Sequence, residues 1–119
     1  MATINMKVRP DGTGGFEVVR ILPSGGPDRN PPHVGNGGNV IRWTRDASIS
    51  SEILVIFPRW ARTIFVQPSK LVESIPSGGD LTRDIDNNPN PRGIRRYKVY
   101  VKSGDDYAEA NSEPGIEVP

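Results

Sequence analysis

Apolar and polar residues alternate in several short segments of this chain, and this period of two predicts β-strands. Residues 3–9 place three apolar side chains on one face and polar side chains on the other. A turn with Pro10 and several glycines follows, so residues 3–9 and 16–22 are expected to form a hairpin. The other predicted strands are residues 40–45, 53–57, 63–67, 94–102 and 115–118.

Two long segments rich in glycine and proline interrupt this pattern. Residues 23–39 contain four prolines and five glycines, and residues 76–93 have a similar character. Proline lacks the N–H donor that a sheet needs, and glycine loses the most entropy on ordering, so both segments predict long loops. Short strands separated by turns are typical of all-β proteins, and we expect residues 1–119 to form a single antiparallel β-sandwich.

The composition narrows the class of protein. With 119 residues the chain is long enough for one domain with one core. Its net charge of +1 argues against a surface devoted to one strongly charged partner. The sequence opens without a signal-peptide pattern, and its longest apolar run, residues 53–57, is far shorter than a membrane-spanning helix. We therefore expect a soluble, cytoplasmic protein without a membrane partner.

Two parts of the sequence resemble the cupredoxin-like β-sandwich. Residues 37–46, Gly-Gly-Asn-Val-Ile-Arg-Trp-Thr-Arg-Asp, are similar to the glycine turn, strand and Trp-Thr pair that precede the first copper ligand in cupredoxins. Residues 97–101 and 113–118 resemble the penultimate and last strands of that fold. The resemblance implies a Greek-key sandwich of the cupredoxin type.

The resemblance does not extend to the copper site. A blue-copper centre needs two histidines and one cysteine, with a weak axial ligand. This chain has no cysteine, and its one histidine, His33, precedes the strand of Trp43. The segment Ser48-Ile49-Ser50 stands where the first histidine of the family falls. We therefore expect a version of the fold that binds neither copper nor another cofactor.

The residues needed for common enzyme chemistry are also missing from the sequence. Nucleophilic catalysis of the Ser-His-Asp type needs a base beside a hydroxyl, and His33 is the only imidazole. Neither a Gly-x-Ser-x-Gly turn nor a glycine-rich phosphate loop occurs. The carboxylates of residues 105–113 gather near a predicted turn without a sign of burial. We expect a protein that is not an enzyme.

Residues 84–88, Asp-Ile-Asp-Asn-Asn, resemble the opening of a calcium-binding loop. Pro89 occupies the position of the required glycine, and Arg95 that of the bidentate glutamate, which excludes an EF-hand. A looser calcium site stays open as an alternative to simple turn formation. Its ligands would be Asp80, Asp84, Asp86 and Asn88.

Residues 94–102 offer a basic face with one aromatic residue, formed by Arg96, Lys98, Tyr100 and Lys102. Basic side chains can hold a phosphate backbone, and an aromatic ring can stack on a base, so this face is a candidate site for nucleic acid or a small anionic ligand. Four further arginines, Arg59, Arg62, Arg92 and Arg95, could extend it. The plainer interpretation is a solvated sheet face, because outward residues of any such strand are polar.

The run of residues 53–57, Ile-Leu-Val-Ile-Phe, has no polar face. Both of its sides must therefore be covered, either by the loop at residues 23–39 or by another chain. Trp60 follows between two arginines, a composition typical of interfaces, so we name Val55, Phe57 and Trp60 as apolar anchors. The function that this favours is a non-enzymatic protein–protein interaction or assembly module, such as a subunit of a homo-oligomer. The alternative is nucleic-acid or anion binding through the basic face.

Overall fold

A computed structural model describes residues 3–34, 39–66, 70–90, 92–110 and 114–118. Strands dominate these residues, which confirms the predicted all-β class. The larger sheet has the order β3-β2-β1-β4-β7, with β1 (Thr3–Pro10), β2 (Phe16–Ile21), β3 (Pro27–Asp28), β4 (Val40–Arg45) and β7 (Leu81–Asp84). The second sheet has the order β10-β9-β5-β6, with β5 (Ile53–Ile56), β6 (Val72–Ser74), β9 (Lys98–Ser103) and β10 (Asp106–Glu109). A two-stranded sheet pairs β8 (Gly93–Arg96) with β11 (Gly115–Val118).

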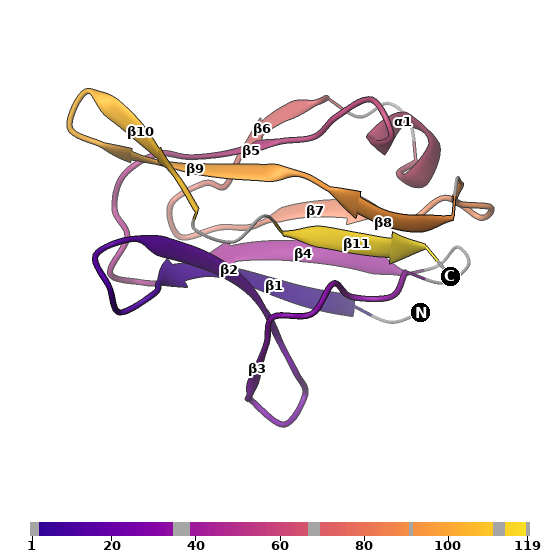
Figure 1. The fold of residues 1–119 in the computed structure, drawn as a ribbon, viewed down its shortest axis with the longest axis horizontal. Coiled ribbons are helices and arrows are strands. Elements are labelled where there is room, and N and C mark those ends of the chain that lie inside the picture. The colour runs from indigo at the N-terminus through magenta and orange to yellow at the C-terminus, as the bar shows by residue number, and fades with distance from the viewer. Residues whose placement is uncertain (1–2, 35–38, 67–69, 91, 111–113, 119) are drawn as a thin grey trace.

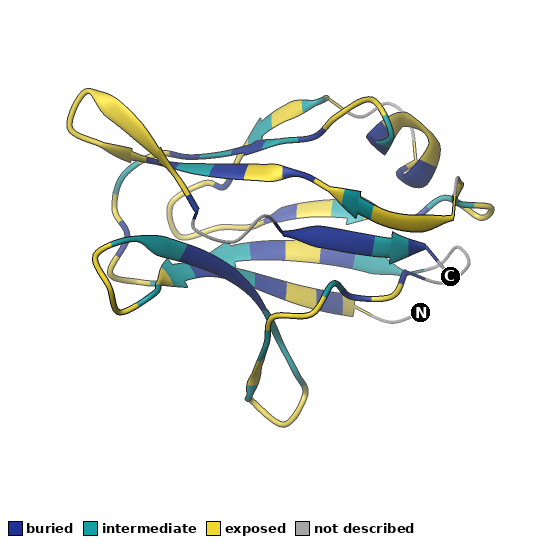
Figure 2. Ribbon diagram, viewed as in Figure 1, coloured by how far each residue is buried: buried dark blue, intermediate teal, exposed yellow. Residues whose placement is uncertain are grey.

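The two larger sheets lie as two layers, with β5, β6, β9 and β10 above β1, β2 and β4 in Figure 1. The short helix α1 (Ala61–Ile64) lies at one end of the upper layer (Figure 1). Buried and exposed residues alternate along the central strands of both layers (Figure 2), as a period of two requires. The buried side chains of both layers form one hydrophobic cluster.

Aromatic rings fill the centre of this cluster. Trp43 from β4 packs edge-on against Tyr97 and Phe65, and its ring centroid lies 5.5 Å from that of Phe57. The indole Nε1 of Trp43 donates a 2.9 Å hydrogen bond to the Tyr97 hydroxyl, and both residues are fully buried. This bond links the two layers, because Trp43 belongs to β4 and Tyr97 precedes β9.

The prediction of a purely antiparallel fold is wrong at one pair of strands. β1 and β4 run parallel, with Met6 opposite Trp43, while the other strand pairs are antiparallel. A parallel pair needs a long connection that returns the chain to the end where the first strand began. β2 itself makes this return, because Ile21 at its end lies opposite Asn5 near the start of β1, and β4 then begins with Val40 opposite Thr3.

Several predicted elements have different structures. Within residues 63–67, Thr63 and Ile64 belong to α1 and not to a strand; the buried side chains of Ala61 and Ile64 hold this short helix against the core. β7 lies inside the segment predicted as a loop at residues 76–93. The sequence does not indicate this strand, because Leu81 is its only buried residue and one buried residue gives no alternating pattern. The long strand predicted at residues 94–102 is divided at Tyr97, whose N–H donates to the carbonyl of Pro114, into β8 and β9.

The loop predicted at residues 23–39 is also partly paired. It contains β3, and His33 forms a parallel bridge to Glu117 of β11. Residues 35–38, which include the glycine turn of the cupredoxin resemblance, lie outside the described residues, as do residues 67 and 113.

Candidate interaction surface

The structure corrects two of the three predicted interface anchors. Val55 and Phe57 are 0% and 1% exposed, and both belong to the core cluster. Their side chains point between the two layers, in phase with Trp43 and Tyr97 of the aromatic centre. Neither side chain is available to a partner of the folded protein, so these residues hold the fold together.

Trp60, the third predicted anchor, is half-buried. Its ring packs against Phe57, Phe65 and Tyr97, and its Nε1 donates a 2.9 Å hydrogen bond to the carbonyl of Arg96. Trp60 therefore fastens the start of α1 to the end of β8, and most of its binding capacity is used within the chain.

The apolar run still has a second face, and that face points outward. Leu54 and Ile56 alternate with the buried residues of β5 and are half-buried themselves. Leu54 lies opposite Tyr100 of β9 and Ile56 opposite Lys98, so these four side chains share the outer face of the second sheet. The described part of the loop at residues 23–39 pairs with β2 and β11 and does not cover them.

Both sequence hypotheses therefore meet on one surface, which we call the upper face. It consists of the outward side chains of β5, β6, β9 and β10: Leu54, Ile56, Val72, Ser74, Lys98, Tyr100, Lys102, Tyr107 and Glu109. Its two most exposed apolar residues, Val72 (53%) and Tyr107 (41%), lie on the edge strands β6 and β10. The sequence pattern missed Val72 and Tyr107 because β6 and β10 are too short to show an alternation.

Polar contacts fix two residues of the upper face. Tyr107 of β10 reaches across Lys102 of β9 and donates a hydrogen bond to the carboxylate of Glu52, the residue before β5. This hydrogen bond, reinforced by partial desolvation and the negative charge of Glu52, raises the pKa of the Tyr107 hydroxyl. Glu109 lies 3.6 Å from the Nζ of Lys98. The charged groups thus lie around Tyr100 and Leu54.

The outer face of the other sheet has a different composition. On its strands β1 and β4, the outward residues other than Val40 are polar: Thr3, Asn5, Lys7, Arg9, Arg42 and Thr44. The neighbouring strand β2 adds Val19, which is fully buried, and Ile21 to the same side. The polar residues of β1 and β4 are those expected of a sheet face in contact with water. The central strands of the upper face instead present Leu54, Ile56 and Tyr100 outward, which makes the upper face the candidate for a partner.

The four arginines predicted to extend the basic face gather, together with Arg96 of that face, at the α1 end of the molecule. Hydrogen bonds from Trp60 to the carbonyl of Arg96 and from Thr63 to the carbonyl of Asn90 bring α1 beside β8 and the preceding loop. The arginines at this end, which we call the basic end, are Arg59, Arg62, Arg92, Arg95 and Arg96. The predicted basic face is therefore divided between two surfaces. Arg96 lies on β8 at the basic end, whereas Lys98, Tyr100 and Lys102 lie on the upper face.

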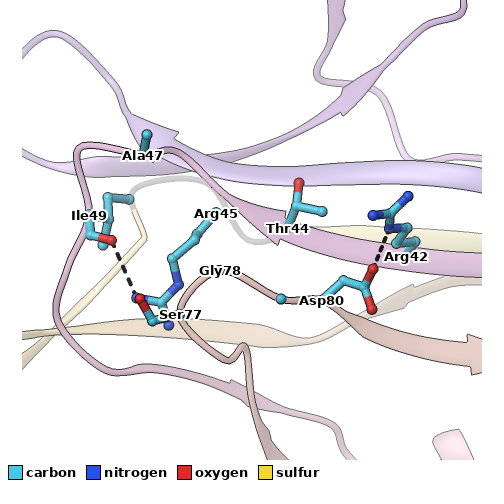
Figure 3. Close-up of a pocket in the computed structure, with 9 residues that line it drawn as sticks. Arg42, Thr44, Arg45, Ala47, Ile49, Ser77, Gly78 and Asp80 are labelled. Atoms are coloured by element: carbon cyan, nitrogen blue, oxygen red, sulfur yellow. Dashed lines mark hydrogen bonds and ion pairs between the residues drawn. The ribbon is translucent and has the colours of Figure 1, made fainter.

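A hollow of about 510 Å³ lies away from the upper face, between β4 and the turn at residues 76–79 (Figure 3). At one end, Arg42 donates to Asp80 at 2.6 Å. At the other, the Arg45 guanidinium donates to the carbonyls of Ile49 and Ser51 and also to that of Ile75. Both cations of this hollow are thus committed to the protein itself, so we do not place the functional site here.

The predicted calcium ligands are also engaged by other groups. Asp80 binds Arg42, and Asp86 accepts a hydrogen bond from the backbone N–H of Asn88, as in an ordinary turn. In the described part of the chain, histidine and carboxylate side chains do not gather in groups of three that could hold a metal ion. His33 lies 2.5 Å from a carboxylate oxygen of Glu117 and helps to hold its loop against β11.

No protein-family model matches this sequence, and no curated protein matches it significantly. The described residues contain no helix that is long and apolar enough to cross a membrane.

Proposed function

We propose that this protein is a non-enzymatic interaction and assembly module of the cytoplasm, and that it associates with a second copy of itself through the upper face. The observation that supports this most directly is the outward Leu54, Ile56 and Tyr100 on the central strands of one sheet, where β1 and β4 of the other sheet have mostly polar residues. Covering a half-exposed apolar side chain contributes roughly half of the 1.5–3 kcal/mol expected for full burial. In a symmetric dimer each residue counts twice.

The charges near this surface also favour a second copy. The basic end lies beyond Lys98, whereas Glu52, Asp105 and Asp106 lie near the opposite end of β9. Two copies that meet with their strands reversed bring the basic end of one near the acidic end of the other. Opposite charges arranged in this way steer association and fix orientation more than they add affinity.

Sedimentation equilibrium tests the proposal with one variant and a matched control. Leu54→Lys places a charge in the centre of the upper face, and Asn5→Lys places the same charge on the exposed outer face of β1. We expect wild type and Asn5→Lys to dimerise and Leu54→Lys to bind roughly 10–100-fold more weakly, because two Leu54 side chains are lost per dimer. Wild type that stays monomeric at about 100 µM, a dissociation free energy below about 5.5 kcal/mol, would refute self-association.

The second candidate function is binding of nucleic acid or a small anion, through Arg96, Lys98, Tyr100 and Lys102 together with the basic end. The gathering of five arginines at the α1 end favours it, although Lys98 is partly neutralised by Glu109. Salt separates the two functions: binding to phosphates weakens steeply as salt rises, whereas an apolar interface holds or strengthens. A fluorescent single-stranded oligonucleotide is a suitable probe, titrated at low and high salt.

We further propose that the fold is a β-sandwich related to the cupredoxins but without their copper site. The two stacked layers with a shared core support a sandwich, and the central position of the Trp43 strand agrees with the resemblance. The parallel pairing of β1 with β4 is the feature to compare when an experimental structure is superposed on that family.

A further inference from the structure

The edge strand β10 borders the upper face and has an unpaired side. The N–H of Ala110 donates to the carbonyl of Val99, so Ala110 and Val99 form a hydrogen-bonded pair. Hydrogen-bonded and non-hydrogen-bonded pairs alternate along an antiparallel ladder, so Ala108 and Val101 form the next hydrogen-bonded pair of the β9–β10 hairpin. Tyr107 and Glu109 fall between these pairs. Their N–H and C=O groups therefore point away from β9, towards the open side of the sheet.

This hairpin is held in an extended form without help from a neighbour on its other side. Its turn is tight, with Gly104 at φ +62°, and all four residues of β10 are exposed. Figure 1 shows the hairpin at the end of the upper layer away from α1. β10 contains neither a proline nor a lysine, the residues that commonly protect an edge strand from pairing.

The other edge strands of the two larger sheets are less suited to pairing. β3 has two residues and one of them is Pro27, which has no N–H. One end of β7 is occupied, because Val66 donates to the carbonyl of Asp84 and Asp86 donates to that of Ile64. β6 has three residues, and a two-fold pairing centred on its middle residue would set Glu73 against Glu73 of the second copy.

We propose that β10 pairs antiparallel with β10 of a second copy across a two-fold axis at Ala108. This inference rests on the proposed self-association and adds a second contact to it, because pairing at the edge leaves both upper faces uncovered. Tyr107 lies opposite Glu109 of the second copy, and each such pair exchanges two backbone hydrogen bonds. The second sheet then becomes a continuous eight-stranded sheet, and the two upper faces lie side by side on it.

Charge selects this register over its neighbours. With the axis at Ala108, Tyr107 faces Glu109 and Asp106 faces Ala110, so no acid lies directly opposite another in the described strand. Moving the axis to Tyr107 sets Asp105 against Glu109, and moving it to Glu109 sets two glutamates against each other; like charges directly opposite are destabilising. The small side chain of Ala108 also suits the axis, where a non-hydrogen-bonded pair brings two Cα atoms to about 4.5 Å.

Disulfide trapping tests this geometry, because the chain contains no cysteine. Ala108→Cys places two thiols at the axis, within reach of a disulfide, whereas Ser103→Cys places an exposed thiol on β9, away from the open edge. With oxidised glutathione as the oxidant, we expect Ala108→Cys to become a covalent dimer and Ser103→Cys to remain a single chain. Equal trapping of both variants indicates random collision and would overturn the inference.

A second variant separates the edge from the upper face. Tyr107→Pro removes an N–H that points to the open side and leaves the hydrogen bonds to β9 intact. We expect Tyr107→Pro to be folded by circular dichroism and to associate no further than a dimer through the upper face by sedimentation. Tyr107→Ala is its matched control, because it loses the same side chain but keeps the N–H, and we expect it to retain the contact at the edge. One set of results would separate the two proposals: wild type dimerises, Leu54→Lys abolishes the dimer, Tyr107→Pro sediments like wild type, and Ala108→Cys is trapped no more than Ser103→Cys. In that case the edge geometry is wrong and the proposed function stands. A wild type that never associates refutes both.

Discussion

The buried hydrogen bond between Trp43 and Tyr97 gives the most quantitative prediction about this fold. Tyr97→Phe keeps the ring in the aromatic centre and removes only the hydroxyl, so the indole N–H of Trp43 is left without its 2.9 Å partner. An unsatisfied buried donor costs about 1–3 kcal/mol. We therefore expect the free energy of unfolding to fall by about 2 kcal/mol at pH 7.

The same hydroxyl makes this difference depend on pH. Burial raises the pKa of Tyr97 well above its ordinary value of 10.0, against the opposing effect of the hydrogen bond from Trp43. Above pH 10 the unfolded chain loses this proton while the folded chain keeps it, so the folded state binds more protons and stability falls as pH rises. The loss is about 1.4 kcal/mol per pH unit, and Tyr97→Phe does not suffer it. The two proteins should therefore reach equal stability at about pH 11.4 if the initial difference is 2 kcal/mol.

Chemical denaturation, followed by tryptophan fluorescence, measures both effects. Unfolding free energies of wild type and Tyr97→Phe are compared at about pH 7, 9, 10 and 11, and the difference between the proteins cancels the titration of groups that they share. Tyr100→Phe is the control, since this residue lies on the outer face of β9, outside the core. A difference near zero at pH 7, or one that does not shrink above pH 10, would refute the reasoning that this hydroxyl is buried, neutral and hydrogen-bonded.

Two further predictions concern residues whose roles the structure redefines. Phe57→Ala should destabilise the fold by about 3–5 kcal/mol, because Phe57 is a core residue in the aromatic centre. Leu54→Lys should leave the melting temperature almost unchanged at low concentration, where self-association does not contribute. The reverse result in thermal unfolding would restore Phe57 as an interface anchor. Arg29→Ala should lower the free energy of unfolding at neutral pH, because the hydrogen bond from Arg29 lowers the pKa of Glu17. The Glu17 carboxylate also accepts a hydrogen bond from Arg9, which the variant keeps. Because its pKa is lowered in the fold, ionised Glu17 stabilises the fold above its ordinary pKa of 4.5, and this stabilisation is lost as pH falls through the folded pKa. The difference in stability between wild type and Arg29→Ala should therefore disappear in acid. A deficit of the same size at pH 3 would contradict this, and urea unfolding at both pH values measures it.

The sequence predicted the long alternating strands well, and it failed where pairing depends on the rest of the chain. β1, β4 and β11 were found at or within one residue of their predicted bounds, because their own alternation marks the buried face. β2 was also found within one residue, although Glu17, Val18 and Val19 are buried in succession. β6, β7 and β10 have too few apolar residues to produce a pattern, and they are strands because a neighbouring strand offers hydrogen bonds. Thr63 and Ile64 show the opposite case, in which β-branched residues enter a helix because the core accepts Ala61 and Ile64 from that geometry.

The candidate surface, too, could be predicted from the sequence only in part. The lack of a polar face at residues 53–57 did indicate a strand with an apolar outer side, but periodicity alone could not tell which side faces the core. The phase was set by the aromatic residues: Phe57 packs with Trp43 and Tyr97, which carries Val55 inward and leaves Leu54 and Ile56 outside. The short strand β10 and its open edge could not be predicted before its partner β9 was placed.

The parallel pair of β1 and β4 also has a consequence for how quickly the chain reaches its native state. Met6 and Trp43 are neighbours across this pair, so the central contact of the larger sheet joins residues on both sides of the entire β2–β3 segment. Closing such a large loop costs entropy before the contact rewards it, and proteins dominated by distant pairings fold in milliseconds to seconds, not microseconds. Until β4 arrives, the newly made β1–β2 hairpin exposes its apolar side and one bare edge. Crowded or freshly synthesised chains are therefore most exposed to aggregation during this interval.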